Sequence, residues 1–196
     1  MNTFIYMVRH GDSPKEGNER TRGLTEKGET DARQLAAILK AEEVNVITSS
    51  PYTRSIQTVE KLAHQIGEEI IVFEDLKERV FTLEDERISD RKLLPLLEKS
   101  FVDFNYSLEG GESNAECQKR AIKVLKEILS VYKEQKIVIG THGAVMTLMM
   151  AFYDNKYDLK FLHSTSKPDI YKMGFKDQTL LSVQRVLVKT GGINNS

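Results

Sequence analysis

Two of the four histidines in this 196-residue chain come soon after short apolar runs, and each is followed by glycine. His10 lies in the segment FIYMVRHGDS, and His142 lies in KIVIGTHGAV. We expect both runs to be buried strands, and the carboxyl ends of parallel strands form the edge where ligands bind. Gly143 has no side chain and opens a predicted helix, so main-chain N–H groups can approach an anion there. The sequence therefore predicts that both imidazoles lie at one anion-binding edge.

Two arginines and one glutamate are predicted at the same edge. Arg9 directly precedes His10, Arg54 falls in the first turn after the second predicted strand, and Glu78 follows the third. A cation weakens a helix N-terminus by roughly 0.3–1 kcal/mol, a conflict that a bound anion removes. Guanidinium groups also match phosphate oxygens with paired, planar donors.

This set of residue types suits phosphoryl transfer through a covalent histidine. A neutral His10 would attack phosphorus, which divides a difficult hydrolysis into two easier steps. Arg9 and Arg54 would bind the phosphoryl oxygens, and a protonated His142 would donate to another oxygen and stabilise the transition state. A protonated Glu78 would supply a proton to the leaving oxygen and then activate water.

The elements that must position these residues alternate along the chain. Apolar runs predict strands over Thr3–Val8, Val44–Thr48, Ile70–Phe73 and Lys136–Gly140, and a terminal hairpin over Ile170–Phe175 and Leu180–Val188. Apolar residues at helical spacing follow three signals for a helix start. These are an N-cap at Thr25, an N-cap at Ser50 with Pro51 at the first helical position, and the capping box that starts at Ser113. A buried helix is also predicted over Ala144–Phe152. This alternation predicts an α/β sandwich with a mostly parallel sheet.

The stretch 80–112 is less regular than the rest of the chain. Pro95 interrupts a helical pattern there, and Gly110-Gly111 closes the stretch. We interpret it as a lid-like insertion over one face of a single domain, 1–196, since this length is typical of one domain.

The composition is that of an ordinary globular protein, with 40% hydrophobic and 29% charged residues. A formal net charge of -1 gives no overall attraction to nucleic acid or to anionic membrane. Cys117 is the only cysteine, so no disulfide can form within the chain. We find no signal-peptide pattern and no apolar run long enough to cross a bilayer, so the expected location is the cytoplasm.

The same motifs resemble those of the histidine phosphatase superfamily, in its phosphoglycerate mutase-like branch. The resemblance rests on RHG at Arg9–Gly11, SSPYTRSIQT around Arg54, LKER around Glu78, GGES at Gly110–Ser113 and THG at Thr141–Gly143. LTEKGETDARQLA from Leu24 is also similar to the usual first helix. These motifs span roughly residues 4 to 150 in the family's order. The resemblance implies a three-layer α/β/α fold, a phosphohistidine on His10 and no metal or other cofactor.

The chain departs from the family pattern at two places. Mutase-like members commonly carry a phosphate-binding asparagine at the position held here by Glu16, and Asn18, two residues later, is the candidate substitute. RVFTLEDER replaces the Gly-x-x-Glu-Gly that commonly follows the acid, so Glu84 and Glu86 compete with Glu78 for that role.

The predicted function is that of a metal-independent phosphatase acting on phosphomonoesters of small metabolites. The chain is short for a phosphoglycerate mutase, and a reduced lid that admits water favours hydrolysis. The alternatives are mutase-type phosphoryl transfer, a phosphoprotein phosphatase and a phosphate-binding regulatory protein without turnover. The expected partner is a small phosphorylated metabolite, and the terminal hairpin could also pair with a second copy in a homodimer.

Overall fold

The computed structural model of the chain describes residues 2–82 and 87–186. Its centre is a six-stranded sheet with the order β3-β2-β4-β1-β5-β6. The strands are β1 (Thr3–Arg9), β2 (Val46–Ser49), β3 (Ile70–Val72), β4 (Lys136–Thr141), β5 (Asp169–Lys176) and β6 (Thr179–Val186). The first four in chain order are parallel to one another, and β5 and β6 are antiparallel additions beside β1. The expected mostly parallel sheet is therefore confirmed.

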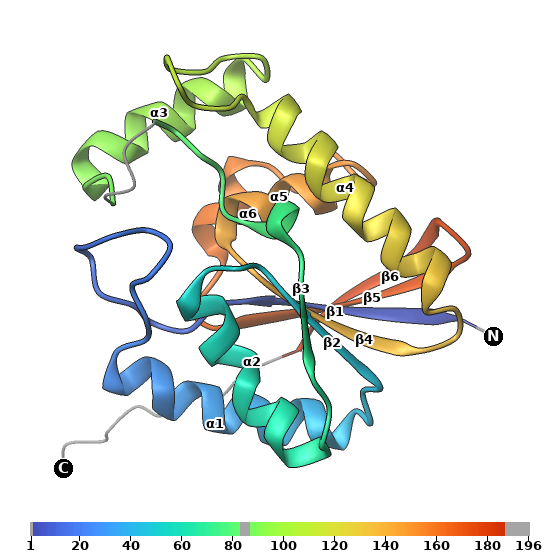
Figure 1. The fold of residues 1–196 in the computed structure, drawn as a ribbon. Coiled ribbons are helices and arrows are strands. Elements are labelled where there is room, and N and C mark those ends of the chain that lie inside the picture. The colour runs from blue at the N-terminus through green and yellow to red at the C-terminus, as the bar shows by residue number, and fades with distance from the viewer. Residues whose placement is uncertain (1, 83–86, 187–196) are drawn as a thin grey trace, which may run out of the picture.

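Helices cover both faces of this sheet. In Figure 1, α1 (Glu26–Ala41) and α2 (Thr53–Ile66) lie on one side, and α4 (Asn114–Val131) and α5 (Gly143–Ala151) lie on the other. This arrangement confirms the expected three-layer sandwich.

The alternation of side chains along β1 explains why both faces are covered. Tyr6 and Val8 belong to the core cluster that contains the buried residues of α1 and α2, whereas Ile5 and Met7 belong to the cluster beneath α4 and α5. Successive strand residues point to opposite faces, so a strand that is apolar at every position needs a layer on each side.

The predicted caps of α1 and α4 are confirmed. The Thr25 side chain accepts the N–H of Gly28, and Ser113 forms a complete capping box with Glu116. Such caps satisfy backbone donors that have no partner within the helix.

The predicted cap of α2 is wrong. The helix begins at Thr53, its N-cap is Tyr52, and no side chain caps it. The Ser50 hydroxyl lies too far upstream to reach the first helical N–H groups. It instead accepts the N–H of Tyr52 and contacts the ring of His142.

The stretch 80–112 holds a regular helix, α3 (Asp90–Val102), which continues through Pro95. The interruption predicted at Pro95 is therefore wrong. Pro95 and Arg91, the residue whose carbonyl loses its donor, are both exposed, so water can satisfy that carbonyl. Together with α6 (Leu159–Ser164), which was not predicted, α3 stands near the carboxyl edge of the sheet (Figure 1).

The terminal hairpin is confirmed as the antiparallel pair β5 and β6. Residues 187 and 188 of its expected second strand lie outside the described residues. Within the described ranges, no helix is both long enough and apolar enough to cross a membrane.

Candidate active site

The ends of β1 and β4 bring the two predicted histidines together. The two strands are parallel, with Arg9 paired to Thr141, and the next N–H along the chain, that of His10, donates to the Thr141 carbonyl at 3.0 Å. The rings of His10 and His142 follow with their centroids 5.2 Å apart. Both residues are buried, with 4% and 0% of their surface exposed.

The hydrogen bonds of His10 fix its tautomer. Nδ1 lies 2.7 Å from the carbonyl oxygen of Gly11, which can only accept, so Nδ1 carries the hydrogen. Nε2 accepts a hydrogen bond from Nε of Arg54 at 3.2 Å. Burial, followed by the charges of Arg54, Lys167 and Arg9, lowers the pKa of His10 well below its usual 6.5. His10 is therefore a neutral imidazole whose Nε2 lone pair faces a guanidinium group.

His142 is also neutral. Burial is the main cause that holds the pKa of His142 well below 6.5, and the charge of Arg54 lowers it further. The ring therefore differs from the protonated donor expected from the sequence. Its Nε2 lies 2.7 Å from Oγ of Ser50, and its buried Nδ1 has no partner among the residues that the structure describes.

Arg54 is fully buried and binds a carboxylate. Its Nη2 lies 2.7 Å from Oε2 of Glu19, and its Nη1 donates to the carbonyl of Glu19. Arg22 donates to both carboxylate oxygens of Glu19 at 3.1 Å. Two guanidinium groups thus converge on one anion beside His10, so the geometry expected for an oxyanion is present there.

Arg9 reaches the same pocket past Gly143. Its Nη1 donates to the backbone and side-chain oxygens of Thr165, and its Nε is buried without a partner in the described part of the chain. A Cβ added at Gly143 would lie 3.0 Å from Cζ of Arg9 and from Cδ1 of Leu162. A side chain at this position would therefore require Arg9 and Leu162 to shift by a few tenths of an ångström.

Glu78 lies at the N-terminus of α5. Its Oε1 accepts the N–H groups of Arg79 at 2.9 Å and Val145 at 3.0 Å, and its Oε2 accepts the N–H of Ala144 at 3.2 Å. Oε1 therefore has two donors among the described residues, and Oε2 has one. The competing candidates Glu84 and Glu86 lie outside the described residues.

Asn18 stabilises its own loop in this structure. Its Oδ1 accepts the N–H groups of Arg20 at 2.9 Å and Thr21 at 3.1 Å, a local turn of the kind that asparagine favours. The residue that this loop sends to Arg54 is Glu19. Asn18 does not belong to the lining of the pocket described next, and its predicted role in substrate binding stays a prediction.

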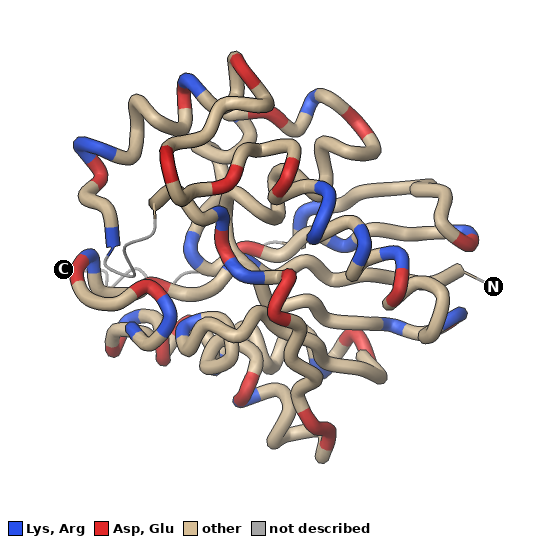
Figure 2. Tube along the Cα trace, turned by 45° about the horizontal axis from the view of Figure 1, so that its top comes forward, with Lys and Arg blue, Asp and Glu red and all other residues tan. Residues whose placement is uncertain are grey.

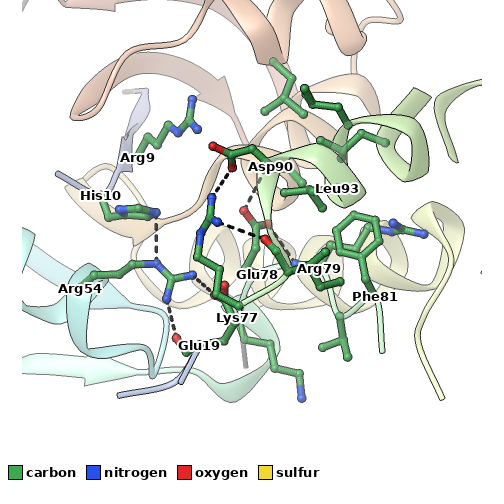
Figure 3. A pocket seen from close by; sticks show the side chains of 18 of the residues that line it. Arg9, His10, Glu19, Arg54, Lys77, Glu78, Arg79, Phe81, Asp90 and Leu93 are labelled. Carbon is green, nitrogen blue, oxygen red and sulfur yellow. Dashed lines mark hydrogen bonds and ion pairs between the residues drawn. The ribbon is translucent and has the colours of Figure 1, made fainter. Parts of the chain in front are cut away.

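Arg9, His10, Glu19, Arg22, Arg54, Glu78 and Gly143 line a pocket with a volume of about 520 Å³, and the fully buried His142 is not part of its lining. Figure 3 shows His10, Arg9 and Arg54 on one side of it and Phe81 and Leu93 on the opposite side. The apolar wall comes from α3, from α6 and from the segment that precedes α3, and its residues are Val80, Phe81, Ile88, Leu93, Leu94, Leu97 and Leu162. The pocket is therefore cationic around His10, and the segments that supply its apolar wall also place Arg79, Arg87 and Asp90 in its lining.

Sequence reasoning missed several cations of this pocket. Arg22, Arg87 and Lys167 also line it, although Lys and Arg are otherwise interspersed with Asp and Glu along the chain (Figure 2). Arg22 lies at the end of the polar loop that leads into α1. Its position directly before Gly23 and the start of this helix is a sequence signal from which its place in the pocket could have been predicted. Lys167 follows the unpredicted helix α6, and the sequence carries no signal for it.

Within the described ranges, no group of three or more His, Cys, Asp or Glu side chains is placed to hold a metal ion. Arginine and lysine side chains are the cations in the lining of the pocket that the structure describes.

Residues 5–179 match the histidine phosphatase superfamily (branch 1), so the chain belongs to this family. It is 28% identical to phosphoserine phosphatase 1 of Hydrogenobacter thermophilus over 74% of this chain and 73% of that protein. It is 26% identical to the uncharacterized phosphatase PhoE of Bacillus subtilis over 76% of each chain. The structure of an Entamoeba histolytica phosphoserine phosphatase with 3-phosphoglyceric acid superposes with a TM-score of 0.78 at 21% identity, covering 96% of this chain and 98% of that one.

These comparisons confirm the expected family and the expected fold. They also confirm, at the level of the family and its phosphatase members, the prediction of a hydrolase acting on phosphomonoesters.

Proposed function

We propose that this protein hydrolyses phosphomonoesters of small metabolites through a phosphohistidine on His10. The observation that carries the proposal is the neutral, buried His10, whose Nε2 lone pair faces Arg54 in a pocket with several cations. Covalent catalysis needs such an unprotonated nucleophile next to groups that stabilise the transferred charge.

In the first step, the phosphoryl group takes the place of the Glu19 carboxylate between Arg54 and Arg22. Nε2 of His10 attacks phosphorus, the new P–N bond forms, and the P–O bond to the leaving group breaks. Glu78 gives its proton to the leaving oxygen, which departs as an alcohol. Arg9, whose Nε has no hydrogen-bond partner among the described residues, adds charge beside the phosphoryl oxygens.

In the second step, a water molecule attacks the phosphorus of phospho-His10. Glu78, now a carboxylate, takes a proton from this water while the P–N bond breaks and the electron pair returns to Nε2. Inorganic phosphate leaves, and Glu78 is again protonated. The reaction is balanced with water as the only co-reactant, and none of its steps uses a metal ion.

The pocket also limits the substrate. Its volume of about 520 Å³ accommodates a phosphoryl group with a small organic part, and the wall opposite His10 is apolar. Relatives named as phosphoserine phosphatases, and the structure with 3-phosphoglyceric acid, support a small phosphorylated metabolite as the substrate. Within that class, the wall of Phe81, Leu93 and Leu94 favours esters that carry an apolar group.

Product analysis tests the proposal against its alternatives. Release of inorganic phosphate from a panel of phosphorylated metabolites, with loss of turnover in His10→Ala, is the expected result. A mutase would return an isomeric phosphate ester, and a phosphate-binding regulatory protein would bind phosphate without turnover. Either outcome would contradict the proposal. The cytoplasmic location and the homodimer stay predictions, which fractionation and light scattering test.

A further inference from the structure

Among the residues that the structure describes, the hydroxyl of Ser50 is the one group hydrogen-bonded to the ring of His142. Ser50 and His142 are both fully buried, and Oγ lies 2.7 Å from Nε2. Sequence reasoning assigned Ser50 to a helix cap that the structure does not contain. Its position at the carboxyl end of β2 instead places it beside the ring that packs against His10.

Counting donors and acceptors shows which atom gives the hydrogen in this contact. The backbone N–H of Tyr52 donates to Oγ of Ser50 at 3.2 Å. Among the described residues, the only other atom bonded to this Oγ is Nε2 of His142. The buried hydroxyl of Ser50 has one hydrogen to donate. The backbone N–H of Tyr52 is itself a donor and cannot accept this hydrogen, so the acceptor is Nε2 of His142.

The opposite assignment would leave one more buried group unsatisfied. If Nε2 carried the hydrogen, the hydroxyl hydrogen of Ser50 would have no acceptor in the described part of the structure. Nδ1 of His142 has no hydrogen-bond partner among the described residues in either tautomer, so this atom does not distinguish them. An unsatisfied buried hydroxyl costs about 1–3 kcal/mol, so the hydrogen is expected on Nδ1.

We propose that Ser50 is a positioning residue that holds His142 as the neutral Nδ1–H tautomer, so that this N–H is the donor offered to a phosphoryl oxygen at His10. The catalytic role of His142 in this inference rests on the proposed function. The tautomer itself does not, since it follows from the hydrogen bonds of Ser50.

This arrangement resolves a conflict within the site. A charged imidazolium at His142 would be repelled by Arg54 and Arg22, and burial removes the water that would stabilise it. A neutral ring with a fixed N–H avoids that repulsion and still places a hydrogen bond on the charge that develops during transfer. Ser50 therefore gives the site a donor without adding a further positive charge.

The experiment is long-range ¹H–¹⁵N NMR of the histidine rings at pH 7.5, which separates the two neutral tautomers by their nitrogen shifts. The chain has four histidines, so variants of His64 and His163 assign the spectrum. We expect the wild-type protein to show His142 with its hydrogen on Nδ1. Ser50→Ala should shift a measurable fraction of this ring to the Nε2–H tautomer, and Ser50→Thr, which keeps a hydroxyl, should not.

Ser49→Ala is the matched control. Ser49 is equally buried and directly precedes Ser50 at the end of β2, but its hydroxyl contacts the backbone oxygen of Ser50 and Oγ of Ser55 and not the ring. In turnover, kcat should fall at least tenfold in Ser50→Ala and change little in Ser50→Thr and Ser49→Ala, since removing one transition-state donor commonly costs 10²–10³-fold.

Two results would overturn the inference: an Nε2–H tautomer in the wild-type protein, or an unchanged tautomer in a folded Ser50→Ala variant. If Ser50→Ala does not fold, the wild-type and Ser50→Thr spectra still decide the tautomer. A wild-type protein that shows the expected tautomer but releases no phosphate from any ester would contradict the proposed function alone.

Discussion

The carboxylate of Glu19 accepts a hydrogen bond from Arg54 at 2.7 Å, while Nε of the same guanidinium donates to Nε2 of His10. The protein thus places its own anion on the arginine that we propose binds the phosphoryl group. In that proposal a substrate displaces this carboxylate, and the departing phosphate is in turn displaced by it. Glu19 is therefore expected to weaken phosphate binding and to speed product release.

Glu19→Gln tests this competition directly. The amide keeps the shape of the side chain but removes the charge that competes with phosphate, and hydrogen bonds to charged groups contribute about 1.5–3 kcal/mol. Because Glu19 is partly exposed, we expect the smaller end of that range, a roughly tenfold lower Kd for inorganic phosphate by calorimetry. Glu16→Gln, which removes an exposed charge from the same loop, should change the Kd little. Weaker phosphate binding in Glu19→Gln would show that the carboxylate assists the site.

Glu78→Gln tests the proton donor. The amide cannot protonate the leaving oxygen, so esters of ordinary alcohols should lose roughly 10²-fold or more in kcat/KM. Hydrolysis of p-nitrophenyl phosphate should slow far less, because its leaving group needs little protonation. The variants Glu84→Gln and Glu86→Gln serve as comparisons, since both residues compete for this role. If Glu78→Gln slows both ester types equally, Glu78 is not the proton donor. If Glu84→Gln or Glu86→Gln instead slows only the esters of ordinary alcohols, that glutamate is the proton donor.

The lowered pKa values of His10 and His142 predict a stability loss in acid. Both rings are neutral in the folded protein, whereas an unfolded histidine takes up a proton near pH 6.5. The unfolded state therefore binds more protons below that pH, and stability falls as the pH falls. Between pH 7.5 and 5.5 each ring should remove up to about 1.4 kcal/mol from the free energy of unfolding.

Urea titrations at both pH values measure this effect. His142→Asn, which has no titrating group, should lose less stability between the two pH values than the wild-type protein does. His64→Asn is the matched control for replacing a histidine, because His64 is exposed on α2. A pH dependence in His142→Asn as steep as in the wild type would indicate that this ring is protonated in the fold.

The apolar wall predicts a preference among substrates. Burying a methylene group contributes about 0.8 kcal/mol, so lengthening an alkyl phosphate should raise kcat/KM up to about fourfold per added methylene until the wall is filled. Leu94→Ser should flatten this series without affecting methyl phosphate. Val102→Ser is the matched control, since Val102 lies on the same helix with 91% of its surface exposed and does not line the pocket. A flat series in the wild-type protein would show that the wall does not bind substrate.

The central residues could be predicted because strand ends impose a simple geometry. Arg9, His10 and His142 follow buried parallel strands, and such strands deliver their next residues to one edge whatever the details of packing. The position of Arg54 could be predicted in the same way, because this residue lies in the first turn of α2, which begins soon after β2 ends.

The rest of the site depends on contacts between segments distant in the sequence. Glu19 reaches Arg54 across 35 positions, and Ser50 reaches His142 across 92. Neither contact has a local signal: Ser50 before proline is typical of a helix cap, and Glu19 lies in a polar loop. The positions of Glu19 and Arg22 depend on the path of that loop over the edge of the sheet. Tertiary packing determines this path.

The most direct test of the account is to trap the phosphoenzyme. The protein is mixed briefly with a substrate identified by phosphate release, quenched without acid, and analysed by intact mass and by ³¹P NMR after digestion in base. We predict a transient gain of one phosphoryl group on Nε2 of His10, because Nδ1 is held by the carbonyl of Gly11, and no such gain in His10→Ala. Turnover without any adduct, or an adduct on Nδ1 or on another residue, would contradict the account.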